Sequence, residues 1–192
     1  MLGEIDNELI REMGIDVTGL FGEKNMFGIV QGNWRVRRTL WEQEVLFPGE
    51  FNYTYNEKGD ILMYPEGDLT ARPSAIMPGS GYFFDALERQ EPIDESTLKV
   101  DDNLEEFGLV TVHDLEYWKK QIEALDHESK GITATLGSTA LGDIALVPGV
   151  GLKNPKGIRS VAEWYMSTLT REDFIKELYG RQTDIAIENL RR

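Results

Sequence analysis

The sequence predicts an α/β fold, mainly because two short apolar runs lie beside amphipathic helices. Residues 15–20 (IDVTGL) and 131–137 (GITATLG) contain the β-branched side chains typical of buried strands. Residues 4–13 carry apolar side chains at helical spacing before the first run, and residues 113–127 do so before the second. A helix, a glycine and then a buried strand are typical of α/β proteins. We therefore expect the two runs to be neighbouring parallel strands.

Residues 42–64 predict an antiparallel hairpin. Aromatic and polar residues alternate in its first strand, and residues 56–59 (NEKG) provide a glycine turn. Residues 65–84 are rich in Pro and Gly and predict an irregular connection with one short strand near 75–77. In a single domain spanning the whole chain, we expect this hairpin and connection to project from the parallel sheet as an insertion.

Two helices are expected at the end of the chain. The first covers residues 160–168, with Ser160 as its N-cap and Glu163 completing a capping box. The second starts at Thr170, where the sequence TRED predicts a cap followed by acidic residues in the first turn. Gly180 is expected to be a weak point of this last helix.

Composition narrows the class of protein. The chain has 192 residues, of which 41% are hydrophobic and 28% are charged, as in a folded domain and unlike a disordered chain. No apolar run is long enough to span a membrane, and the acidic N-terminus does not resemble a secretory signal. The chain has no Cys, which excludes disulfides and thiolate–metal sites. We expect a cytoplasmic protein.

The net charge of −14 arises from 20 basic and 34 acidic residues, and it argues against nucleic acid as a partner. Much of the excess lies in residues 85–128, where we expect a solvated acidic surface. The predicted parallel sheet has only two strands, too few to cover both of its faces. We therefore expect the chain to be incomplete by itself and to associate with another copy or a further polypeptide.

Three stretches resemble the uroporphyrinogen decarboxylase-like superfamily, in its branch of cobamide-dependent methyltransferases: residues 13–20 (MGIDVTGL), 61–94 (ILMYPEGDLTARPSAIMPGSGYFFDALERQEPID) and 140–190 (ALGDIALVPGVGLKNPKG and onward). The family fold is a (β/α)8 barrel, which takes about 250 residues. The resemblance therefore implies a partial (β/α)8 TIM-barrel, an N-terminal half-barrel with the antiparallel hairpin inserted. Its C-terminal half would be missing or supplied elsewhere.

Departures from the family narrow the reaction that the resemblance implies. The arginine-containing segment Met-Arg-Gln-Ala-Gly-Arg of the decarboxylases is absent, and residues 137–143 lack their active-site tyrosine, so uroporphyrinogen decarboxylation is disfavoured. The methyltransferases hold zinc with His and Cys, and this chain has no Cys. The resemblance thus implies corrinoid-dependent methyl transfer by a complete system that includes a corrinoid protein. We expect the isolated chain to bind no cofactor or metal and to be inactive.

In a barrel the chemistry lies in the loops that follow the strands. After the second predicted strand, Asp143 is the candidate catalytic residue, and Ser138 and Thr139 are candidates for substrate binding. After the first, Glu23 and Asn25 are candidates for substrate binding. Each has a plainer interpretation: Asp143 as a helix or turn cap, Ser138 and Thr139 as turn residues, and Glu23 and Asn25 as parts of a solvated loop.

Basic and imidazole side chains complete the candidates. Arg35, with Arg37 and Arg38, could bind a carboxylate or phosphate, or could pair with the acidic excess of the chain. His113 and His127 flank one predicted helix and are better explained as caps than as metal ligands. The alternative to an enzyme portion is a binding or assembly module that performs no reaction.

Overall fold

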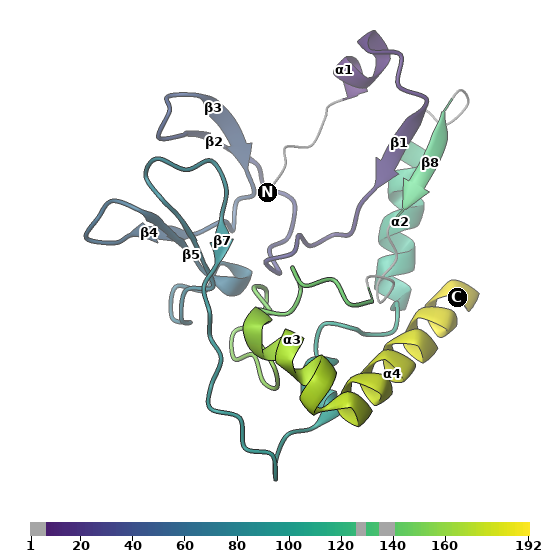
Figure 1. The fold of residues 1–192 in the computed structure, drawn as a ribbon. Helices are drawn as coiled ribbons and strands as arrows, with labels where there is room; N and C mark the ends of the chain where they lie inside the picture. The colour runs from purple at the N-terminus through teal and green to yellow at the C-terminus, as the bar shows by residue number, and fades with distance from the viewer. Residues whose placement is uncertain (1–6, 126–129, 135–140) are drawn as a thin grey trace.

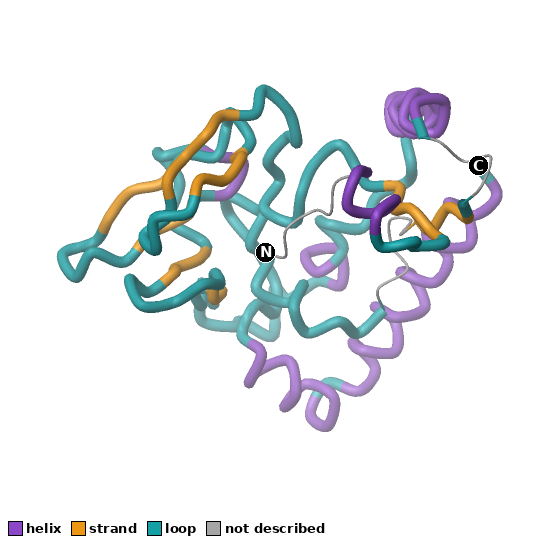
Figure 2. The backbone as a smooth tube through the Cα atoms, turned by 90° about the horizontal axis from the view of Figure 1, so that it is seen from above, coloured by secondary structure: helices purple, strands orange, loops and turns teal. Residues whose placement is uncertain are grey.

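The computed structural model describes residues 7–125, 130–134 and 141–192. Most of the strands lie on one side of the molecule and most of the helices lie on the other, with long loops between them (Figures 1 and 2). No helix within these ranges is long and apolar enough to span a membrane.

A small parallel sheet confirms the pairing expected from the sequence. β1 (Val17–Leu20) pairs in parallel with β8 (Gly131–Ala134), with Val17 opposite Gly131 and Leu20 opposite Ala134. α1 (Asn7–Glu12) precedes β1, and α2 (Val112–Ala124) precedes β8. Thr111 caps α2 in a capping box with Asp114, so this helix begins slightly before the range expected for it.

The remaining strands are antiparallel. One ribbon pairs β2 (Arg35–Arg38) with β3 (Glu44–Phe47). A second sheet has the order β4 (Tyr53–Tyr55), β5 (Ile61–Met63), β6 (Ala75–Met77) and β7 (Asp85–Ala86). Gly59 has a φ of 81° in the turn between β4 and β5, a conformation that favours glycine, and β6 is the short strand expected near 75–77.

The expected half-barrel is wrong. The described residues form three separate small sheets of two, two and four strands, and only β1 and β8 are parallel. The expected insertion is also divided, because β3 pairs with the preceding β2 and not with β4. The strands between β1 and α2, from β2 to β7, pair antiparallel with their neighbours in sequence. That pairing leaves no third strand beside β1 and β8 among the described residues.

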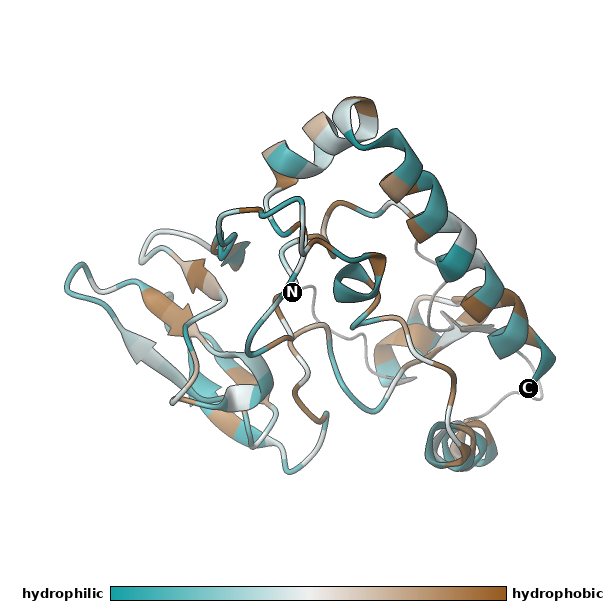
Figure 3. Cartoon of the chain, turned by 90° about the horizontal axis from the view of Figure 1, so that it is seen from below, coloured by the Kyte–Doolittle hydropathy of each residue, from teal (hydrophilic) through white to brown (hydrophobic). Residues whose placement is uncertain are grey.

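Two apolar clusters support these elements. One packs Phe51 and Met63 of the strand region against Phe27, Ile29 and Val150 of the loops. The other joins the two C-terminal helices to the neighbouring loops through Val100, Val147, Ile158, Trp164, Ile175 and Leu178. Hydrophobic and hydrophilic residues alternate along α4 (Glu172–Arg191), as a helix with one buried face requires (Figure 3). Val147 and Trp164 of the second cluster also line a pocket between these helices and the loops.

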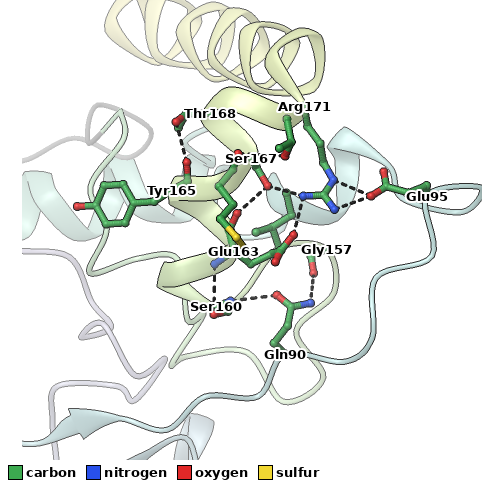
Figure 4. Close-up of polar contacts among 12 residues, drawn as sticks. Gln90, Glu95, Gly157, Ser160, Glu163, Tyr165, Ser167, Thr168 and Arg171 are labelled. Atoms are coloured by element: carbon green, nitrogen blue, oxygen red, sulfur yellow. Dashed lines mark hydrogen bonds and ion pairs between the residues drawn. The ribbon is translucent and has the colours of Figure 1, made fainter.

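The first of the two C-terminal helices begins after its expected N-cap, and the second does not. The Ser160 side chain caps α3 (Val161–Thr170) by accepting from the Glu163 N–H. The capping box is not completed, because the Glu163 carboxylate pairs with Arg171 at 2.6 Å and the Ser160 N–H donates to Gln90 at 3.0 Å (Figure 4). Thr170 ends α3 and does not cap α4 (Glu172–Arg191), which runs through Gly180 without a break. Arg171, at the junction of the two helices, pairs with both Glu163 and Glu95.

Lys153 connects the strand region to the loops, because its ammonium lies 2.9 Å from Asp68 and 3.0 Å from Glu66. A hydrogen bond from the Thr70 hydroxyl, together with Lys153, lowers the pKa of Asp68 to about 2. A carboxyl whose pKa is lower when folded stabilises the protein above about pH 4, and this contribution is lost as the pH falls towards 2.

We therefore expect Asp68→Asn to lose less stability than the wild type between pH 4 and pH 2, as measured by urea unfolding at a series of pH values. Asp16→Asn is the matched control, because Asp16 is exposed and makes no side-chain hydrogen bond with a described residue. Equal losses in wild type and Asp68→Asn would contradict the role given to Asp68.

Candidate functional site

A small pocket of about 20 Å³, partly open to solvent, lies where α3 and α4 meet two loops. One loop contributes Asn103, Glu106 and Phe107, and the other contributes residues between Gly142 and Val147. Arg159, Trp164 and Gln182 complete the lining, so charged, amide and aromatic side chains face one space. This composition is typical of small-ligand sites, in which a few polar groups lie among apolar walls.

Asp143, the candidate catalytic residue, lines this pocket at its exposed side. Its Oδ1 accepts a hydrogen bond of 2.9 Å from the Ala145 N–H, so the turn role expected as the alternative is also present. Gly142 has a φ of 73°, and the Tyr179 hydroxyl lies 2.8 Å from where a Cβ would be. The positive φ favours glycine at this position, and the turn that Gly142 forms places Asp143 at the pocket.

Arg159 anchors the inner side of the pocket, with a side chain only 2% exposed. Its Nη1 donates to Glu106 Oε2 at 2.7 Å, and its Nη2 lies 3.2 Å from Glu105 Oε2. The same guanidinium donates to the Lys156 carbonyl at 2.6 Å and to the Asp102 carbonyl at 2.7 Å. A buried guanidinium requires such partners, and Arg159, held by these contacts, fixes the position of the Glu106 carboxylate.

The Glu106 carboxyl has a perturbed acidity. Burial raises its pKa above the ordinary value, and the Arg159 guanidinium only partly opposes this effect. Its Oε1 makes no hydrogen bond with a described residue, since Arg159 binds Oε2. A buried carboxyl with a raised pKa that lines a pocket is a candidate functional group.

Gln182 is the third polar group of the pocket. Only 3% of the residue is exposed, and its Oε1 is buried without a hydrogen-bond partner among the described residues. A buried amide oxygen without a partner is uncommon, because leaving it unbonded costs about 1–3 kcal/mol. Gln182 is held there by its place on the buried face of α4, between Leu178 and Ala186.

The other candidates from the first predicted loop do not line the pocket. Glu23 Oε2 lies 2.9 Å from His113 Nε2 and so joins this loop to α2. Asn25 Oδ1 accepts from the Phe27 and Ile29 N–H groups at 3.0 and 3.2 Å, which is a turn role. The predictions for Ser138, Thr139 and His127 fall outside the described residues.

Arg35, Arg37 and Arg38 lie on β2, which belongs to a different sheet from β1. None of them forms an ion pair with a described residue, so the pairing with acidic side chains given as one alternative is not found among these residues. The Arg37 guanidinium lies 5.1 Å from the centre of the Tyr53 ring, and Arg38 Nε donates to the Glu42 carbonyl at 3.2 Å. Arg35 is exposed. Other arginines pair with the acidic stretch instead: Arg72 with Glu91, Arg171 with Glu95, Arg181 with Asp101, and Arg159 with Glu105 and Glu106.

Sequence reasoning missed Glu106, Arg159 and Gln182. Gln182 had a usable signal, since it is a polar residue on the apolar stripe of α4. Glu106 was hidden within a run of acidic residues, and Arg159 lies in a loop without periodicity. Their meeting depends on long-range packing, which no local pattern reports.

No family model, curated protein or solved structure matches this chain. Within the described ranges, no three His, Asp or Glu side chains cluster closely enough to hold a metal ion.

Proposed function

We propose that this chain is the N-terminal portion of a uroporphyrinogen decarboxylase-like enzyme related to corrinoid-dependent methyl transfer, and that its pocket binds part of the substrate. The observation that carries the proposal is that Asp143 lines one pocket with the buried Glu106–Arg159 pair. The parallel pairing of β1 with β8 supports it, because the carboxyl ends of the two strands then lie at the same edge.

Each polar group has a distinct part in this proposal. Arg159 holds Glu106 in place and neutralises it, which leaves Glu106 Oε1 to hold a proton or accept a hydrogen bond. Asp143 presents Oδ2 from the exposed side, and Gln182 presents an amide from the buried side. A substrate group that enters the pocket therefore meets oxygen acceptors from three different segments of the chain.

The zinc that the resemblance implies does not fit the residues described. Its ligands would include Cys, and the chain has none. Carboxylates alone favour magnesium or calcium over zinc. We therefore place the zinc, the thiol acceptor and the corrinoid on other polypeptides, one of them a corrinoid protein, and derive no step through them.

The test is a methyl-transfer assay with methylcobalamin as donor and a small thiol as acceptor, followed by the absorbance of the cobalamin. We expect no turnover by the purified chain, and turnover when a His- and Cys-bearing polypeptide encoded beside it is added. In that mixture Asp143→Ala should lower kcat/KM about 10- to 100-fold, because a charged hydrogen bond is worth about 1.5–3 kcal/mol.

His113→Ala is the control, since His113 pairs with Glu23 away from the pocket with its side chain 68% exposed. We expect this variant to stay within about twofold of the wild type, because exposed pairs contribute little. Turnover by the chain alone, or a larger loss in His113→Ala than in Asp143→Ala, would contradict the proposal.

A binding or assembly module without a reaction is the second candidate, and the exposure of all four residues of β8 favours it. In the described part of the chain β1 and β8 pair only with each other, so each leaves an edge to which a second copy or another polypeptide could add a strand. Stable association without turnover in every mixture would select this candidate. For either function we propose a cytoplasmic location, because a chain without Cys forms no disulfides and needs no oxidising compartment.

A further inference from the structure

The three polar groups of the pocket lack the partners that would use all their oxygen atoms. Glu106 Oε1, Asp143 Oδ2 and Gln182 Oε1 make no hydrogen bond with any described residue. The Gln182 oxygen is the most informative of the three, because only 3% of this residue is exposed. An acceptor buried there either finds a donor in the pocket or remains unbonded.

The charge of the pocket indicates the sign of the missing donor. Arg159 is the cation of the lining, and it is already shared between Glu105 and Glu106. Asp143 adds a carboxylate that makes no ion pair with a described residue. Arg89 lies nearby, but its Nη atoms donate to the Leu152 and Gly149 carbonyls. Negative charge therefore remains at the open side, and a cationic ligand would complement it.

The number of free acceptors indicates the shape of the donor. A primary ammonium has three N–H donors and no acceptor, and it matches three carboxylate or amide oxygens that come from separate segments. Trp164 and Phe107 line the same space, and an aromatic face attracts a cation by about 0.5–2 kcal/mol. Leu146 and Val147 offer an apolar wall for the carbon chain of such a ligand.

We propose that the pocket binds a primary ammonium group, held by Gln182 Oε1, Glu106 Oε1 and Asp143 Oδ2. This inference rests on the proposed function only in taking the pocket as a substrate site, and it names the chemical class of the group bound there. A loss of the positive charge of the ligand would leave the Asp143 carboxylate without its counter-ion, so selectivity for cations follows from the same contacts.

The probe is ethylammonium chloride, titrated into the purified chain by calorimetry at constant ionic strength. Tetramethylammonium and potassium chlorides are the comparison ligands, because the first has the charge without N–H donors and the second is a simple monovalent cation. We expect saturable binding of ethylammonium at least tenfold tighter than either. Equal binding of the three cations, or no binding of ethylammonium, would overturn the proposal.

Gln182→Leu removes the buried acceptor at similar volume. It should weaken ethylammonium binding about tenfold or more, since a hydrogen bond to a charged group is worth about 1.5–3 kcal/mol. Without ligand this variant should be at least as stable as the wild type, because it no longer buries an unbonded amide oxygen. Gln121→Leu on α2 is the matched control and should bind as the wild type does.

Unchanged binding by Gln182→Leu would also overturn the proposal. Because the titration needs no turnover, it separates the two proposals: ethylammonium binding without methyl transfer in any mixture rejects the proposed reaction alone. Methyl transfer without ethylammonium binding rejects the ligand class alone.

Discussion

Arg159→Met is expected to lower the free energy of unfolding by about 3–5 kcal/mol, because it removes the cation of a buried ion pair and leaves the carboxylates behind. The Arg159 side chain is 2% exposed, and it pairs with Glu106 at 2.7 Å and Glu105 at 3.2 Å. The carbonyls of Lys156 and Asp102 lose their donor at the same time. Urea unfolding followed by circular dichroism measures the loss.

Arg72→Met is the matched control, since Arg72 and Glu91 form an exposed pair at 2.8 Å with side chains 68% and 70% exposed. This variant should change stability by less than about 1 kcal/mol. Adding Glu106→Gln to Arg159→Met should cost less than the sum of the single changes, because the second substitution removes a carboxylate that has already lost its partner. A loss below about 1 kcal/mol for Arg159→Met would show that the pair does not anchor the pocket.

Phe51→Ala is expected to destabilise the strand region by about 3–5 kcal/mol, the usual loss for a large buried aromatic side chain. Phe51 is 1% exposed, and its ring centre lies 4.9 Å from that of Phe47 and 5.9 Å from that of Phe84. The substitution removes these ring contacts and opens a cavity between the β2–β3 ribbon and the four-stranded sheet. Thermal unfolding and the near-ultraviolet circular dichroism of the aromatic side chains report both effects.

Two further variants sharpen this prediction. Phe51→Leu keeps most of the buried volume and should cost clearly less than Phe51→Ala. Phe83→Ala makes the same chemical change at a side chain that is 58% exposed, so its effect should be much smaller. Similar losses in Phe51→Ala and Phe83→Ala would mean that Phe51 does not hold the two sheets together.

Local signals in the sequence predicted the elements whose causes are local. The apolar spacing of residues 113–127 corresponds to α2, and the glycine turn before β5 has the expected positive φ at Gly59. Ser160 caps α3 because its hydroxyl reaches an N–H three residues away. Residues 35–38 gave no such signal, since a strand of mostly charged residues has no apolar alternation, and β2 was missed.

The expected half-barrel failed for a different reason. The pairing of β1 with β8 is correct, but a barrel requires further parallel strands, and a resemblance to a family does not show which strands pair in this chain. Likewise, Asp143 was found from its place after the second strand, while the residues around it were not. The difference is that Asp143 follows an element visible in the sequence, whereas its neighbours come from distant segments.

The sequence by itself determined the positions of the main helices, the parallel strand pair, the acidic character and the absence of cysteine chemistry, because periodicity, turn residues and composition are properties of short segments or of simple counts. Only the tertiary structure decided that Arg159 pairs with Glu105 and Glu106, that Gln182 is buried without a partner, and that Asp143 lies beside them. The physical reason is that a charged or amide side chain can be satisfied by many partners or by water. Long-range packing of α3, α4 and two loops selects which of these it meets.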